Sequence, residues 1–157
     1  MTHSTIHQER REQVAAALRA RVPERCILSD PEDTRPYECD GLAAYRQLPM
    51  IVALPANEEQ VLAILNVCRE LDVPIVPRGA GTGLSGGALP IAEGVVISTA
   101  RMNRIVRVDA YSRTAVVQPG VRNLAISDAA AQYGLYYAPD PSSQIACTIG
   151  GNVAENS

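Results

Sequence analysis

The chain has 157 residues, the size of about one domain, and carries a net charge of −3. With 46% hydrophobic and 20% charged residues, its composition is that of an ordinary globular protein, and it disfavours a nucleic-acid binder, which needs net positive charge. All basic residues are Arg and all aromatic residues are Tyr. Chemistry that depends on lysine is therefore excluded within this chain, and Val, Ile, Leu and Ala must fill the core.

Four cysteines are spread through the chain without any C-x-x-C pair: Cys26, Cys39, Cys68 and Cys147. This spacing indicates free thiols in a reducing compartment rather than a zinc site or a redox dithiol. The N-terminus is polar and no apolar run approaches about 18 residues, so we expect a cytoplasmic chain without a transmembrane segment. His3 and His7 are four residues apart but lack a third ligand at motif spacing, and we expect no metal site.

The first predicted element is an amphipathic helix over residues 6–22, where apolar residues from Ile6 to Val22 recur at helical spacing. Residues 23–49 contain four prolines and many acidic residues, and this composition predicts an ordered lead-in without long elements. We therefore divide the chain into an N-terminal helix and lead-in, 1–48, and a domain, 49–157.

The domain begins with a β-α-β pattern. A strand is predicted over 50–54, a helix over 57–71 with Asn57 as its N-cap, and a second strand over 74–77. This order is typical of a parallel strand pair joined by a crossover helix.

Further strands and one more helix follow. The strands are predicted near 94–100, 104–110 and 114–118. The last two are separated by only a few residues, which predicts a hairpin. A helix is expected over 121–133 with Gly134 as its C′ residue, and the remaining residues show few regular signals.

The most informative segment is a loop with five glycines in nine positions, at 79, 81, 83, 86 and 87. So many glycines are costly in backbone entropy, which disfavours a plain connecting loop. Successive backbone N–H groups in such a loop can point into one concavity and bind a pyrophosphate without lysine. Gly81, Gly83 and Gly86 satisfy G-x-G-x-x-G, but the loop runs into a predicted strand rather than a helix, so the Rossmann arrangement fails on context.

Three motifs carry a family resemblance: VPRGAGTGLSGGALP, QPGVRNL and YYAPDPSSQIACTIGGNVAENS. Together they resemble the FAD-binding domain shared by vanillyl-alcohol oxidase and p-cresol methylhydroxylase. Within that superfamily the chain is most similar to the FAD-linked subunits of bacterial glycolate oxidases and to the related D-lactate and D-2-hydroxyglutarate dehydrogenases. The resemblance runs from about Pro49 to Ser157. It implies an α+β fold, namely the first subdomain of a p-cresol methylhydroxylase-type FAD-binding domain, truncated at the C-terminus.

The resemblance also implies which residues lie against non-covalently bound FAD. The loop supplies Gly79, Ala80, Gly81, Thr82, Gly83 and Leu84, whose amides cradle the pyrophosphate, with Ser85 and Gly86 closing it. A short turn near the cofactor supplies Pro119, Gly120 and Val121, and a second loop beside the flavin supplies Pro139, Asp140 and Ser143. A last segment, near the pyrophosphate and ribityl chain, supplies Cys147, Thr148, Gly150, Gly151 and Asn152, with Asn156 at its edge.

Some side chains keep two interpretations. Arg78 either reaches a phosphate or is a solvated or ion-paired residue at a strand end. Asp140 either accepts from an amine of the flavin or adenine or caps a turn between two prolines. Cys147 is interpreted as a small packed residue rather than a covalent flavin tether.

The resemblance implies an oxidoreductase part in which FAD accepts hydride from Cα of a small 2-hydroxy acid, with companion oxidase subunits as further partners. The family's substrate-contacting Arg and its catalytic and metal-binding His residues lie beyond this sequence, so no catalytic residue is assigned and the chain alone is expected to be inactive. The alternative is a non-catalytic nucleotide-binding or assembly module. A flavin absorption spectrum favours the first interpretation, and colourless protein that still binds ADP favours the second.

Overall fold

The computed structural model describes the backbone of residues 3–156 and the side chains of residues 7–156. The side chains of His3 and Ile6, and all of Ser157, therefore lie outside the described residues. The chain forms two compact units, described separately below. The first contains the residues up to Arg78 together with Gly83–Ser98, and the second contains Gly79–Thr82 and the residues from Thr99 onward.

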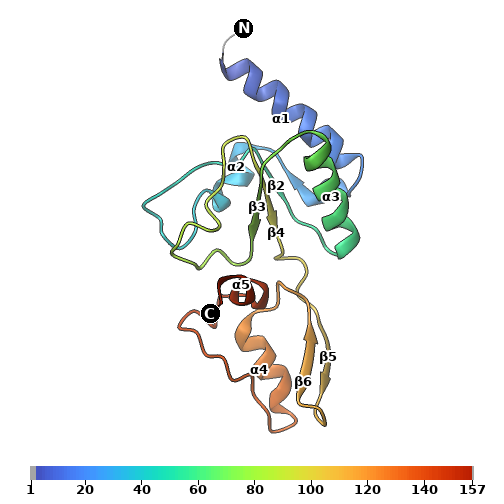
Figure 1. The fold of residues 1–157 in the computed structure, drawn as a ribbon, viewed down its shortest axis with the longest axis vertical. Helices are drawn as coiled ribbons and strands as arrows, with labels where there is room; N and C mark the ends of the chain where they lie inside the picture. The colour runs from blue at the N-terminus through green and yellow to red at the C-terminus, as the bar shows by residue number, and fades with distance from the viewer. Residues whose placement is uncertain (1–2, 157) are drawn as a thin grey trace. The chain divides into compact units, whose positions relative to one another are not determined.

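The first unit is built on a four-stranded sheet (Figure 1). Its strands are β1 (Ile27–Leu28), β2 (Ile51–Ala53), β3 (Ile75–Arg78) and β4 (Val95–Ser98), in the order β1-β2-β4-β3. β4 is parallel to both neighbours, and β1 is antiparallel to β2. The β-α-β prediction is thus correct in its elements, but β2 and β3 do not pair, because β4 lies between them. β1 was not predicted.

The sheet is buried on both faces because its alternating side chains enter two different cores. On one face, Ile51, Val95 and Ile97 pack with residues of α1 (His3–Arg19) and α3 (Glu58–Glu70). On the other face, Val52, Val76 and Val96 form a smaller cluster. Aliphatic residues, with Met50, Cys26 and Cys68 in the larger core, fill both cores without Phe or Trp, and Tyr37 only flanks the smaller one.

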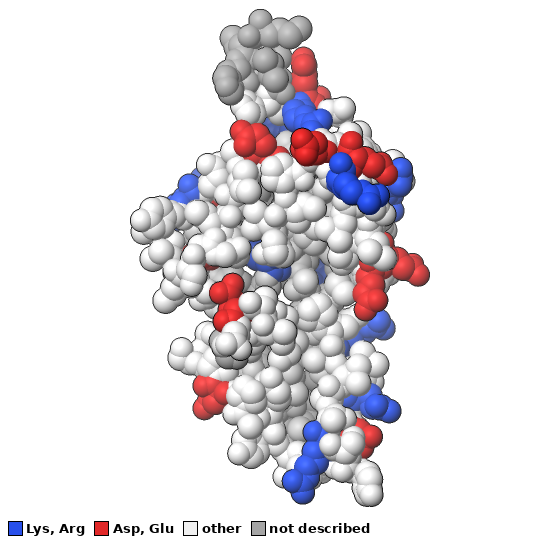
Figure 2. Space-filling model, in the orientation of Figure 1, with Lys and Arg blue, Asp and Glu red and all other residues white. Residues whose placement is uncertain are grey.

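The helices of this unit follow from local signals. α3 begins after Asn57, whose side-chain oxygen accepts a hydrogen bond from the Gln60 N–H at 2.9 Å, which confirms the predicted N-cap. α1 ends at Arg19, three residues before the predicted end. Figure 2 shows charged side chains gathered over the outer surface of these two helices, as expected for amphipathic helices with one solvated face.

The segment between α1 and β2 holds only short elements: η1 (Glu24–Cys26), β1, α2 (Pro31–Thr34) and η2 (Arg35–Tyr37). It belongs to the first unit, and Cys26 and Ile27 are part of that unit's main core.

The second unit contains a hairpin and two helices (Figure 1). β5 (Ile105–Asp109) and β6 (Thr114–Val117) are antiparallel, which confirms the predicted hairpin. α4 (Asn123–Ala131) packs against β5, and Gly134 takes the predicted left-handed conformation with φ of 66°. α5 (Ile149–Glu155) was not predicted. Among the described residues, no helix is both long and apolar enough to cross a membrane.

Candidate functional site

The glycine loop contains neither helix nor strand, which confirms that it is not a Rossmann turn. Gly81 and Gly86 have φ values of 71° and 79°, a left-handed conformation that side chains with a Cβ rarely adopt. Gly83 differs from both. It has no positive φ, and a Cβ placed on it meets no atom within 4 Å. Folding therefore explains glycine at positions 81 and 86 but does not require it at 83.

In the first unit, a buried carboxylate holds the second half of this loop. Asp40 is 7% exposed, and its two oxygens accept hydrogen bonds from the N–H groups of Gly86, at 2.8 Å, and Leu42, at 2.9 Å. The Gly41 N–H donates to the Gly83 carbonyl at 2.9 Å. The Gly86 N–H is thus used within the protein, and the cofactor role expected for Gly86, closing the loop, stays a prediction.

Arg78, at the end of β3, takes part in the same arrangement. Its guanidinium donates to the carbonyl oxygens of Cys39, at 2.7 Å, and Ala88, at 3.5 Å, and lies over the ring of Tyr37. This side chain is therefore neither simply solvated nor ion-paired. It ties the segment before β2 to the end of the glycine loop, so a segment that sequence analysis treated as a lead-in positions the loop.

The second unit contains a recess of about 360 Å³ that begins at the first half of the loop. Five predicted cofactor residues line it: Gly79, Ala80, Gly120, Val121 and Thr148. Five other residues were not predicted: Ala100, Asn103, Ile105, Arg122 and Ala125. Arg122 directly follows the Pro119–Val121 turn, so extending that motif by one residue would have found it. The other four carry no motif in the sequence.

One polar atom in this recess has no partner. Thr148 is 7% exposed, and no described atom makes a hydrogen bond with its Oγ1. The same oxygen lies 2.7 Å from the position that a Cβ on Gly79 would occupy, so only glycine leaves it accessible from the loop. A buried hydroxyl without a partner is destabilising unless a ligand or water completes it. Glycine amides and a hydroxyl donor suit the phosphates of FAD, so these residues fit that cofactor.

Other predicted residues of the second unit have packing roles. A Cβ on Gly120 would lie 2.2 Å from the Thr99 carbonyl oxygen, and one on Gly150 would lie 2.7 Å from the Pro119 Cβ. Glycine at 120 therefore lets the turn approach the backbone at Thr99, and glycine at 150 lets α5 approach the turn.

A buried amide pair links two further predicted residues. Asn152 donates to Asn123 Oδ1 at 3.0 Å, and Asn123 Nδ2 donates to the Pro139 carbonyl at 3.0 Å. Asn123 is 1% exposed and was not predicted. It holds the loop around residue 139 close to the start of α4 and α5.

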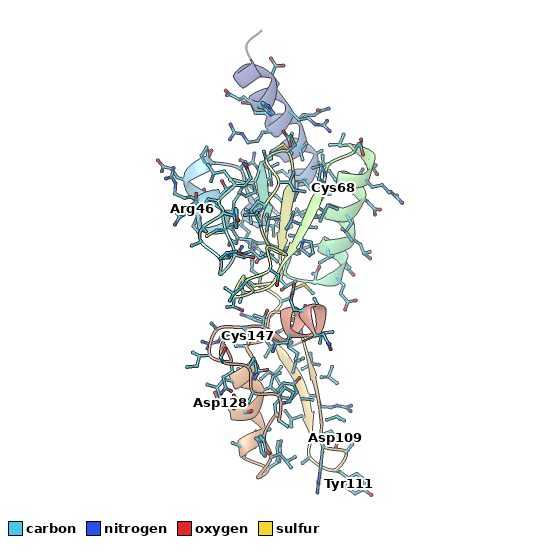
Figure 3. All side chains as sticks on the ribbon, turned by 60° about the vertical axis from the view of Figure 1, so that its left-hand side comes forward. Arg46, Cys68, Asp109, Tyr111, Asp128 and Cys147 are labelled. Atoms are coloured by element: carbon cyan, nitrogen blue, oxygen red, sulfur yellow. The ribbon has the colours of Figure 1, made fainter. Side chains whose placement is uncertain are left out.

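The remaining predicted residues lie in loops or at helix ends. Asp140 is exposed and accepts a hydrogen bond from the side-chain amide of Gln144, and both of its interpretations stay open. Cys147 is 3% exposed and lies in the segment before α5, as Figure 3 shows, which agrees with a small packed residue. Asn156 ends α5 in the left-handed conformation. Thr82, Leu84, Ser85, Ser143 and Gly151 do not line the recess.

Among the described residues, two titratable groups have clearly shifted pKa values. Burial raises the pKa of the Cys68 thiol on α3 to about 11. At the hairpin turn, hydrogen bonds from Ser112 and, to a lesser extent, from the Tyr111 N–H lower the pKa of Asp109. Neither group lines the recess. Among the described residues, no three His, Cys, Asp or Glu side chains are placed to bind a metal.

Comparison with solved structures defines the fold class. p-Cresol methylhydroxylase matches with a TM-score of 0.81 at 22% identity, over 93% of this chain and 29% of that one. An alkyldihydroxyacetonephosphate synthase matches with a TM-score of 0.80 at 23% identity, over 93% and 32%. The chain thus has the α+β fold of the p-cresol methylhydroxylase type.

The family follows from the sequence profile. The profile described as "FAD binding domain" matches residues 49–157, and the chain belongs to that family. Its cofactor is therefore FAD.

Curated relatives narrow the similarity further. The glycolate oxidase subunit GlcD of Escherichia coli K12 is 62% identical over 146 residues, which cover 93% of this chain and 29% of the relative. The D-lactate dehydrogenase of Archaeoglobus fulgidus is 44% identical over 106 residues, which cover 68% of this chain and 24% of the relative. The chain thus spans less than a third of the length of these relatives.

Proposed function

We propose that this chain is the FAD-binding part of a flavin-dependent 2-hydroxy-acid oxidoreductase that acts on a small substrate such as glycolate or D-lactate. The observation that carries the FAD site is the recess of the second unit, where Gly79 gives access to the unpartnered hydroxyl of Thr148. Two relatives whose sequences align with most of this chain, a glycolate oxidase subunit and a D-lactate dehydrogenase, support the substrate class.

In this proposal the chain's own residues bind and orient the cofactor. The backbone amides of the glycine loop, expected over residues 79–84, and the hydroxyl of Thr148 donate to phosphate oxygens, while Asp40 and Arg78 hold the second half of the loop in its shape. When bound, FAD supplies the acceptor for a hydride from the carbon that bears the substrate hydroxyl. The groups that orient the substrate and take its hydroxyl proton are proposed to lie outside these 157 residues.

The proposal includes partner subunits and a cellular compartment. One relative is named as a subunit, which supports companion oxidase subunits for this protein. All four cysteines are free, as expected for a reducing compartment such as the cytoplasm.

The test is reconstitution of the purified chain with FAD, followed by an activity assay with glycolate and D-lactate and a dye acceptor. We expect a bound flavin spectrum and no turnover. Turnover by this chain alone would show that the catalytic groups are misplaced. Colourless protein that binds ADP but not FAD would favour a non-catalytic nucleotide-binding module instead.

A further inference from the structure

The recess of the second unit has one charged lining residue, Arg122. Its side chain is exposed, and no ion pair or side-chain hydrogen bond joins its guanidinium to another described residue. No carboxylate lines the recess to neutralise it. The sequence contains no lysine, so a positively charged side chain that binds a ligand here must be an arginine.

Arg122 is held next to the unpartnered hydroxyl of Thr148. The backbones of these two residues form an isolated antiparallel bridge, which fixes their separation. Both side chains line the same recess, and both can donate hydrogen bonds. A guanidinium and a hydroxyl that converge on one space without a carboxylate suit an anionic, oxygen-rich ligand.

The first two backbone amides of α4 are not available to such a ligand. The Asn123 N–H donates to the Cys147 carbonyl at 3.0 Å, and the Leu124 N–H donates to the Gln144 carbonyl at 3.1 Å. Because these two amides are already used, we assign the recognition at this end of the recess to side chains.

We propose that Arg122, together with Thr148, binds phosphate oxygens of the FAD diphosphate. Arg122 is thereby assigned as a cofactor-binding residue in addition to the glycine loop. This assignment rests on the proposed function, because it takes FAD as the ligand of the recess.

The test compares the FAD affinity of the wild type with that of Arg122→Gln and Thr148→Val, using FAD and ADP as probes. The matched control is Arg107→Gln, which removes the same charge from an exposed position on β5 outside the recess. We expect Arg122→Gln to raise the dissociation constants of both FAD and ADP by about 10–100-fold, as for the loss of a charge-assisted hydrogen bond. It should also weaken their salt dependence, and its melting temperature should match the wild type. Arg107→Gln should stay within about twofold of the wild-type affinity.

Thr148→Val separates binding from folding. It removes a buried hydroxyl that has no partner in the folded chain, so the melting temperature without FAD should rise by about 2–4 °C while the FAD affinity falls. A purely structural role for Thr148 would move both quantities in the same direction.

The possible failures are distinct. Wild-type affinity in Arg122→Gln, or an equal loss in Arg107→Gln, overturns the assignment of Arg122 and leaves the proposed function intact. A wild-type chain that binds neither FAD nor ADP overturns the proposed function, and the assignment with it.

Discussion

Gly83→Ala separates cofactor binding from folding more cleanly than other substitutions in the loop. In the folded chain an added Cβ at Gly83 meets no atom within 4 Å, and the residue has no positive φ. The substitution should therefore keep the free energy of unfolding within about 1 kcal/mol of the wild type and can raise it slightly by restricting the unfolded chain. Folding thus gives no reason for glycine at this position, whereas the close approach of a phosphate, which the family resemblance implies, does.

The expected effect on binding follows from the same geometry. A methyl group that displaces a phosphate from one loop amide removes a charge-assisted hydrogen bond of about 1.5–3 kcal/mol, or about 10–100-fold in affinity. Flavin fluorescence titration measures this affinity, and thermal unfolding without FAD measures stability. Gly83→Val should weaken binding further, and a Gly81→Val, Gly83→Val double variant should abolish it.

Gly134→Ala is the control with the opposite expectation. Gly134 also has open space around its Cα, but its φ of 66° makes any Cβ unfavourable by about 1–2 kcal/mol. It should lose stability and keep wild-type FAD affinity. Unchanged FAD affinity in Gly83→Ala and Gly83→Val would refute the claim that the cofactor approaches the loop here.

Three further predictions concern other parts of the chain. Asp40→Ala should leave the glycine loop more open to protease and lower FAD affinity at least tenfold, measured well below the melting temperature, and saturating FAD should restore protection. At pH 8, iodoacetamide should modify the half-buried Cys39 first and should reach Cys68 only in denaturant, because burial keeps the Cys68 thiol protonated. Mass spectrometry of the alkylated peptides measures the order, and modification of Cys68 before Cys39 would contradict this prediction. Hydrogen bonds, above all from Ser112, lower the pKa of Asp109 from its ordinary value of 3.8, so the carboxylate should stabilise the hairpin turn above pH 3.8. This stabilisation should be lost as the pH falls through the lowered pKa of the folded chain. Hydrogen exchange of the Ser112 amide should then become faster relative to the same amide in Asp109→Asn, which has no carboxylate to protonate.

The elements that sequence predicted well are those with strong local signals. α3 has a helical apolar face and an N-cap at Asn57, and the β5–β6 hairpin has two β-rich runs with a short gap.

Replacing Cys147 by Ser should leave FAD bound, because Cys147 is a small buried residue rather than a covalent flavin tether.

The elements that sequence did not predict depend on non-local contacts. β1 has only two residues and exists through its pairing with β2. The position of β4 between β2 and β3 is a property of the whole sheet, which no local period encodes. α5 contains Gly150 and Gly151, which are poor helix formers, yet Gly150 is needed for the close approach to Pro119.

The candidate site shows the same division. Glycine motifs located the loop and one wall of the recess, because backbone binding of phosphates requires that residue type. Asp40 and Arg122 were missed for different reasons. Asp40 acts on Gly86, which is 46 positions away, and Arg122 is a single charge at the start of a helix, a common surface feature without the recess around it.

The most direct test of the central claim is to saturate the purified protein with FAD, remove free flavin, denature the protein by heat and identify what is released. We predict about one FAD per chain, recovered entirely in the supernatant, since we propose that the loop, Thr148 and Arg122 hold FAD without a covalent bond. A chain that retains no flavin after saturation, or flavin that remains attached to the denatured protein, would contradict this account.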